Sequence, residues 1–207
     1  MHPRSPPLRA LLVLALAILA AGCVPTGRFD PQSTTMLWRD VSADRGALRL
    51  GGSLRPMLLA ITDRRGGETL EQRYVLRNDT RAKGENFLAL KISADGKATR
   101  VTSDQFMAAV AAPVGAVDAN SIREGQNRYG PFLYVSGRPE GSPGCLFALQ
   151  RLQRSLGVAL PSGIDQADIT LRVCDAAASP DDLLGLMGDW TLDPALGDPT
   201  ARLAAGY

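Results

Sequence analysis

Cysteine provides the most reactive side chains of this chain, and the first of its three cysteines ends an export signal. The first residues include Arg4 and Arg9, and an apolar run extends from Ala10 to Ala21. Basic, apolar and small residues in this order predict a secretory signal peptide over residues 1–22. The segment closes in Leu19-Ala20-Ala21-Gly22-Cys23, a lipobox pattern in which small residues fit the peptidase and the thiol accepts a diacylglyceryl group. We therefore expect Cys23 to be lipidated and to begin the mature chain.

Two other interpretations of this segment stay open. Ala20 stands where bacterial lipoboxes prefer Leu, so an ordinary cleaved signal with a chance cysteine is one of them. An uncleaved anchor is the other, although a bilayer span needs about 20 apolar residues. With the lipobox, each buried CH₂ of the acyl chains contributes about 0.8 kcal/mol to membrane attachment. The protein is then expected in the cell envelope, lipid-anchored and facing the periplasm. Val24, which is not the Asp that retains some lipoproteins at the inner membrane, slightly favours the outer membrane.

Cys145 and Cys174 are the two cysteines that remain after Cys23. An exported protein passes through an oxidising compartment, where paired thiols form disulfides. With two cysteines left, the connectivity is unambiguous. Closing a loop of about 30 residues stabilises a fold by roughly 3–4 kcal/mol. Two buried, reduced thiols are the alternative.

The composition excludes several classes of chemistry. The only histidine is His2, within the signal, so the mature chain can build no Ser-His-Asp triad, no Cys-His dyad and no His-ligated metal. Two cysteines cannot form a four-thiolate site. Of the 23 Lys and Arg residues, Arg4 and Arg9 leave with the signal, so 21 face 21 Asp and Glu and the mature net charge is zero. We expect no catalytic residue, no metal, no cofactor and no nucleic-acid partner.

Two groups of side chains could still act on a sugar polymer. Asp118 and Glu124, in a polar segment over 118–128, could form a glycosidase-type acid pair, which needs carboxyls about 5–9 Å apart. Tyr129, Phe132 and Tyr134 could stack on sugar rings as a saccharide-contacting rim. The competing interpretation places the aromatics in the core of a sheet and leaves the polar segment as a solvated loop.

The hydrophobic pattern predicts an α+β domain over 37–192: a mainly antiparallel sheet, two short helices and one disulfide. Strands are expected over 70–76, 88–92, 129–135, 145–150 and 168–175, and the first two are expected to pair. If the strands of the two cysteines are antiparallel neighbours, the disulfide joins them across the sheet. Residues 23–36 are expected to form a flexible tether, and residues 193–207 a loosely ordered tail.

Capping signals predict both helices. Thr102 and Gln105 have capping-box spacing, Phe106, Met107 and Val110 form an apolar stripe, and Pro113 ends the pattern. The stripe is expected to cover one face of the sheet. A second helix begins at Ser179, with Pro180 in its first turn and the adjacent Asp181 and Asp182 in a capping role. Its apolar face is expected to include Leu183, Leu186, Met187 and Trp190.

The order and spacing of five motifs resemble the BcsN family, described as a cellulose biosynthesis protein of alphaproteobacteria. The motifs lie between residues 68 and 190: Gln72-Arg73-Tyr74-Val75-Leu76, Gly84-Glu85-Asn86, Tyr129-Gly130-Pro131-Phe132 followed by Cys145, Leu171-Arg172-Val173-Cys174, and the helix from Ser179. The resemblance implies a non-catalytic accessory lipoprotein of cellulose synthesis or export. The partners it implies are the membrane, through the lipid anchor, and cellulose synthase complex proteins or the glucan. A glucan-binding module, a carboxylate-based glycan enzyme and a lipoprotein subunit of another secretion or pilus assembly stay as alternatives.

Overall fold

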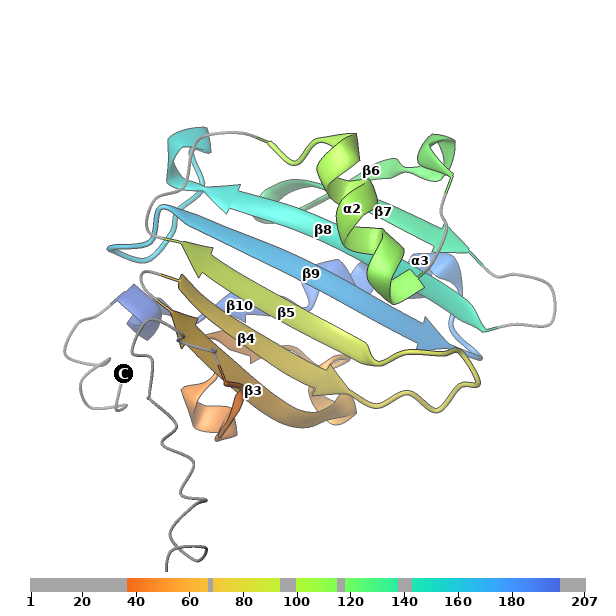
Figure 1. The fold of residues 1–207 in the computed structure, drawn as a ribbon, viewed down its shortest axis with the longest axis horizontal. Coiled ribbons are helices and arrows are strands. Elements are labelled where there is room, and N and C mark those ends of the chain that lie inside the picture. The colour runs from red at the N-terminus through yellow and green to blue at the C-terminus, as the bar shows by residue number, and fades with distance from the viewer. Residues whose placement is uncertain (1–36, 67–68, 94–99, 115–117, 138–142, 198–207) are drawn as a thin grey trace, which may run out of the picture. The chain divides into compact units, whose positions relative to one another are not determined.

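The computed structural model describes residues 37–66, 69–93, 100–114, 118–137 and 143–197, which belong to one compact unit. About half of them lie in strands, all paired antiparallel (Figure 1). One sheet has eight strands in the order β1-β3-β4-β5-β9-β8-β7-β6, and a second sheet pairs β10 with β2. The eight strands are β1 (Arg39–Val41), β3 (Leu58–Gly66), β4 (Thr69–Leu76), β5 (Asn86–Ser93), β6 (Arg123–Asn127), β7 (Gly130–Gly137), β8 (Gly144–Gln153) and β9 (Gln166–Asp175). The small sheet consists of β2 (Leu48–Leu50) and β10 (Trp190–Leu192).

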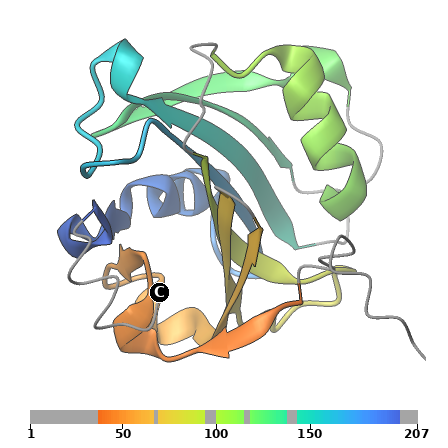
Figure 2. The same ribbon diagram turned by 60° about the vertical axis from the view of Figure 1, so that its left-hand side comes forward.

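Two α-helices lie on opposite faces of the large sheet (Figure 2). Helix α2 (Ser103–Val114) packs on the face that we call the outer face, and α3 (Pro180–Gly185) packs with β2 and β10 on the inner face. Short 3₁₀ segments complete the described chain: η1 (Ala43–Arg45), η2 (Arg55–Met57), η3 (Ala119–Ser121), η4 (Arg154–Leu156), η5 (Leu186–Gly188) and η6 (Pro194–Gly197). The predicted antiparallel sheet with two short helices is confirmed, and a mainly-β description fits it as well as α+β.

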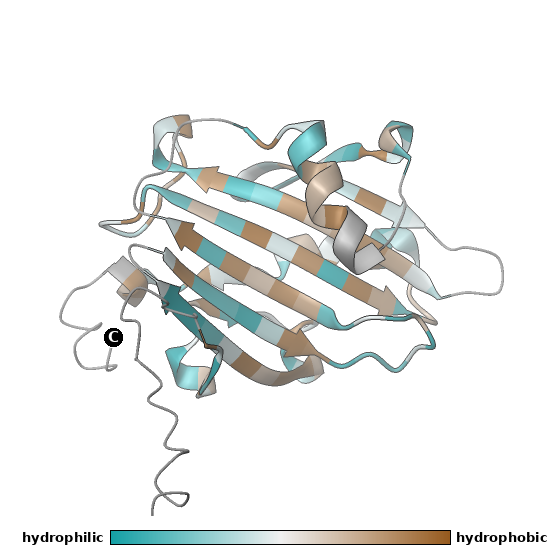
Figure 3. Cartoon of the chain, viewed as in Figure 1, coloured by the Kyte–Doolittle hydropathy of each residue, from teal (hydrophilic) through white to brown (hydrophobic). Residues whose placement is uncertain are grey.

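Alternation along the central strands builds two apolar layers. In β8, Leu146, Ala148 and Leu152 point to the inner face, while Phe147 and Leu149 point to α2. Both sets are buried, so Leu146-Phe147-Ala148-Leu149 form a continuous apolar run within the strand. Along β4, β5 and β9, hydrophobic and hydrophilic residues alternate instead (Figure 3), because their inner side chains enter the main core and many outer ones are polar.

The predicted capping box of α2 is confirmed, and at α3 the box consists of Ser179 and Asp182 without Asp181. Thr102 and Gln105 exchange hydrogen bonds at the start of α2, and its side chains Phe106 and Val110 are buried against the sheet. The helix ends at Val114, one residue beyond Pro113.

Helix α3 begins as expected but is shorter than expected. Ser179 is its N-cap, with Pro180 in the first turn. The helix gives way to η5, and Trp190, expected on its apolar face, opens β10 instead. Gly185 and Gly188 weaken a helix here. The Asp189 carboxylate accepts hydrogen bonds from the amides of Ser53 and Leu54, which fastens this segment beside β2.

Two parts of the polar sequence contain structure that the pattern did not predict. Residues 118–128, expected to be a loop, form η3 and the edge strand β6. Strand β6 is polar because it pairs with β7 alone. At the other end, Asp193 donates its amide to the Ala47 carbonyl, and 194–197 form η6. Residues 198–207 of the predicted tail, and all of 1–36 with Cys23 and the predicted tether, lie outside the described residues.

Candidate functional site

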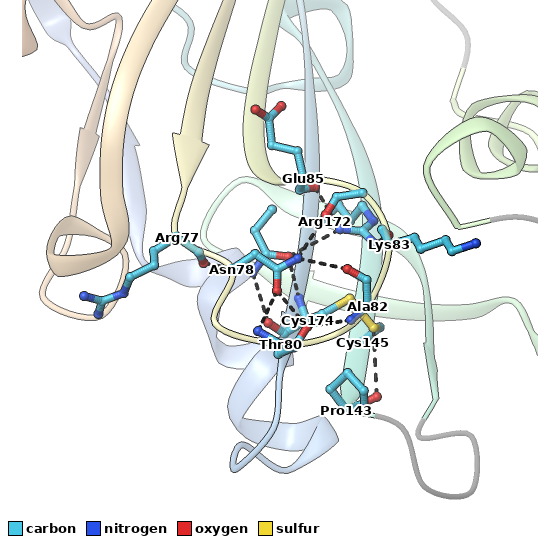
Figure 4. Close-up of a disulfide and its surroundings, with 12 residues drawn as sticks. Arg77, Asn78, Thr80, Ala82, Lys83, Glu85, Pro143, Cys145, Arg172 and Cys174 are labelled. Carbon is cyan, nitrogen blue, oxygen red and sulfur yellow. Dashed lines mark hydrogen bonds between the residues drawn. A yellow bond between two sulfur atoms is a disulfide. The ribbon is translucent and has the colours of Figure 1, made fainter.

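Cys145 and Cys174 form the predicted disulfide across β8 and β9 (Figure 4). They are direct register partners, and their Cα atoms lie 4.0 Å apart, closer than the usual spacing of about 5.5 Å. The amide and carbonyl of Cys174 both bind the Asn86 side chain, at 2.9 and 3.0 Å, on the side away from β8. The two cysteines therefore form a non-hydrogen-bonded pair, in which antiparallel strands approach most closely.

Arg172 fastens the loop between β4 and β5 beside this disulfide. Its side chain is 3% exposed and donates hydrogen bonds to the carbonyls of Lys83 (2.5 Å) and Glu85 (2.8 Å). Desolvation lowers the pKa of the Arg172 guanidinium from its usual value. Gly84, at φ 95°, brings the loop backbone against the guanidinium, since a Cβ there would lie 3.2 Å from Nη2. This end of the sheet is a satisfied polar anchor rather than an open reactive site.

Tyr129 lies at the junction of the two sheets. Its ring stacks on Trp190, with centroids 4.9 Å apart and planes 9° from parallel, and its hydroxyl accepts the Leu192 amide at 3.1 Å. Next to it, Asn127 donates to the Gln150 side chain at 2.8 Å and to the Met187 carbonyl at 2.7 Å. These contacts attach β10 and η5 to the inner face.

Phe132 and Tyr134 follow on β7 and face the same core. Phe132 is 4% exposed and lies over Gly125, its partner on β6. Tyr134, with its ring centroid 6.0 Å from that of Phe132, is partly buried, as is Tyr129. The three rings predicted to form a rim therefore pack against the main core, and their contact with a glycan stays a prediction.

Asp118 and Glu124, which could have formed an acid pair, lie on different elements. The Asp118 carboxylate accepts the Asn120 amide at 2.9 Å and caps η3. Glu124 lies exposed on the edge strand β6, across from Leu133.

The outer face carries a row of charged residues that sequence reasoning missed. One residue from each of five adjacent strands meets its neighbour in register, with the signs alternating; in order from β3 to β8 this charge row is Arg64, Glu71, Lys91, Asp168 and Arg151. The members come from positions far apart in the chain, so only strand pairing aligns them. Outward-pointing polar residues along single strands were the one available signal.

Contacts along the charge row hold its side chains in place. Arg64 donates from Nε to the Glu71 carboxylate at 2.6 Å, and Lys91 Nζ lies 3.7 Å from the same carboxylate. At the other end, Arg151 binds Asp168 through two parallel hydrogen bonds of 2.7 and 2.9 Å. The Asp168 hydrogen bond raises the pKa of the Arg151 guanidinium. Bidentate pairs of this kind fix geometry as well as charge.

Trp38 lies at the β3 end of the charge row. The Arg64 guanidinium carbon is 4.7 Å from the centroid of the Trp38 ring, a cation–π contact, and Trp38 is 42% exposed. Helix α2 covers the other end, where Phe147 and Leu149 are buried under it. Over β3, β4 and β5, in contrast, the described chain places no helix on the outer face (Figure 1).

No group of three or more His, Cys, Asp or Glu side chains among the described residues could hold a metal ion. No helix within the same residues is both long and apolar enough to cross a bilayer.

The family model described as cellulose biosynthesis protein BcsN matches residues 50–202, most of the chain. The chain belongs to the BcsN family. The predicted family is thus confirmed, and its description associates this BcsN protein with cellulose biosynthesis. No curated protein and no solved structure matches the chain.

The BcsN match includes the disulfide, the Tyr129 junction and all five members of the charge row. Trp38 precedes the matched region. The match ends at residue 202, so β10 and η6 also belong to the family domain.

Proposed function

We propose that this BcsN protein is a non-catalytic lipoprotein of the cell envelope that assists cellulose biosynthesis or export. The observation that carries the proposal is the family match over residues 50–202. Lipidated Cys23 would attach the domain to a membrane, with the outer membrane slightly favoured, and residues 23–36 would hold it in the periplasm. Proteins of the cellulose synthase complex are the expected partners.

The state of the carboxylates supports a non-catalytic role. A general acid at neutral pH needs a raised pKa. Hydrogen bonds from Ser179 instead lower the pKa of the Asp182 carboxyl, and Asp168 and Glu71 are paired with cations in the charge row. With residues 1–22 removed, the chain would also lack histidine, the commonest general acid and base.

Gene deletion in the cellulose-producing host tests the accessory role. Deletion is expected to reduce cellulose, measured as acid-insoluble glucan, and the wild-type gene is expected to restore it. Cys23→Ser, accumulating to the same level, is expected to fail because the protein no longer reaches its partners at the membrane. Unchanged cellulose in the deletion strain would overturn the proposal.

Two further measurements test the lipid anchor with its membrane location and the absence of catalytic activity. Radiolabelled palmitate should label the wild type and not Cys23→Ser, and sucrose-gradient fractionation should place the label with outer-membrane markers. The purified protein should leave cello-oligosaccharides unchanged by chromatography over a long incubation, and any turnover would contradict the non-catalytic assignment.

A further inference from the structure

We infer that the open part of the outer face, from Trp38 across Arg64 and Glu71 to Lys91, binds a β-glucan chain. We call this surface the platform. The inference rests on the proposed function, because it takes the polymer made by the partner machinery as the ligand. It places glucan contact on the opposite face of the sheet from the rim predicted at Tyr129, Phe132 and Tyr134.

The exposed indole is the first argument. Tryptophan is usually largely buried, yet Trp38 is 42% exposed, while Trp190 is 2% exposed and stacked on Tyr129. The Arg64 guanidinium lies over the Trp38 ring, and Glu71 in turn holds Arg64. A ring oriented before binding loses little conformational freedom when an apolar sugar face stacks on it.

The charge pattern is the second argument, and it selects the ligand. Arg64, Glu71 and Lys91 alternate in sign and sum to +1, and both cations lie against the one Glu71 carboxylate, so little charge is left to attract a polyanion or an anionic lipid surface. A hydroxyl both donates and accepts hydrogen bonds, so it can pair with the cationic and the anionic groups alike. A neutral polymer covered with hydroxyls therefore matches this row better than any charged partner.

The dimensions are the third argument. Neighbouring strands lie about 4.8 Å apart, so three steps from β1 to β5 span about 14 Å, enough for more than one sugar ring. Lys91, with a side chain 53% exposed, ends this stretch, and the Thr62 and Arg73 pair forms the next outward row. The glucan would run across the strands, with one ring on Trp38 and the following hydroxyls along the charge row.

Acrylamide quenching of tryptophan fluorescence gives a direct test on the full protein in detergent micelles. The chain contains two tryptophans, and Trp190 is buried, so quenching reports on Trp38. Cellohexaose is expected to lower the quenching constant by about half, whereas dextran of similar length should not. Affinity electrophoresis through soluble β-glucan should show Trp38→Ala binding at least about tenfold more weakly, and Lys91→Ala more weakly too.

A matched variant controls for the loss of an exposed apolar side chain. Leu156→Ala removes another exposed apolar side chain, on η4, and should bind as the wild type does. Wild-type affinity in Trp38→Ala, an unchanged quenching constant with cellohexaose, or loss of binding in Tyr134→Ala alone would overturn the platform. Protection of Trp38 in anionic vesicles without glucan would also overturn it, since it would identify a membrane contact.

The two proposals fail in different ways. Reduced cellulose in the deletion strain together with absent glucan binding would remove the platform and leave the accessory role intact. Glucan binding by a protein whose deletion leaves cellulose unchanged would remove the accessory role instead.

Discussion

Gly125 determines where the ring of Phe132 lies. The two are partners across β6 and β7, and the ring covers the glycine so closely that a Cβ at position 125 would lie 2.5 Å from it. The ring thus replaces the missing side chain and is buried. Phe132 therefore lies in the core of the sheet, as the competing interpretation of these aromatics expected.

Gly125→Ala should therefore lower the free energy of unfolding by about 1–3 kcal/mol, because the ring must leave its position. Urea denaturation measures the loss, and Gly137→Ala on β7, where nothing lies within 4 Å of the added carbon, is the control. Combining Gly125→Ala with Phe132→Val should recover part of the loss, so the two changes should not be additive. Strict additivity would contradict the close packing.

At the scale of elements, the disulfide joins β8 and β9, two interior neighbours of the large sheet. It closes a loop with a sequence separation of 29 residues, so Cys145→Ala/Cys174→Ala should cost roughly 3–4 kcal/mol of unfolding free energy. Urea denaturation with a phosphine reductant should bring the wild type to the level of the variant and leave the variant unchanged. Equal stability with and without reductant would contradict this assignment.

The start of α3 should depend on pH. Hydrogen bonds from the Ser179 side chain and backbone lower the pKa of the Asp182 carboxyl below its usual 3.8. A lowered folded-state pKa stabilises the fold above pH 3.8, and this stabilisation is lost as the pH falls through the folded value. Asp182→Asn should thus melt at a lower temperature than the wild type at pH 6, and the difference should shrink below pH 3.8.

Asp181→Asn is the matched control, because the described contacts give the Asp181 carboxylate no part in the capping box. Its melting temperature should differ less from that of the wild type over the same pH range. An Asp182→Asn difference that stays constant from pH 6 to below pH 3.8 would contradict the capping role of the charge.

At the scale of the whole molecule, the two faces of the large sheet are covered by apolar clusters of unequal size. The inner face packs against α3, β2 and β10 in the main core, whereas α2 rests on the smaller of the two clusters in the described chain, around Phe106, Val110 and Phe147. Regions with fewer buried apolar contacts open at lower free energy. The layer that borders the platform is thus the more easily opened one.

Native-state hydrogen exchange should show this difference directly. Amides of α2 should exchange with a lower opening free energy than those of β5, β8 and β9. Phe106→Ala should lower the α2 value by about 3 kcal/mol, and the partly buried Met107→Ala by less. Equal opening free energies for α2 and the central strands would indicate a single cooperative unit.

The features that the sequence alone predicted correctly are those that depend on local chemistry. Alternation predicted β4 and β5, capping residues predicted the starts of α2 and α3, and the number of cysteines predicted the disulfide. Each of these depends on residues close together in the chain or on their number. The family was reached in the same way, from the order of short motifs.

Only the tertiary structure decided what lies side by side across the sheet. The charge row joins residues from five strands, the place of Phe132 depends on Gly125 of its neighbour, and β6 is a strand because β7 offers it hydrogen-bonding partners. Strand register and sheet order are set by the packing of the whole core, not by any one segment. The sequence by itself therefore determined the central strands, the helix starts, the disulfide and the family, while the pairing of strands decided which surface is available to a ligand.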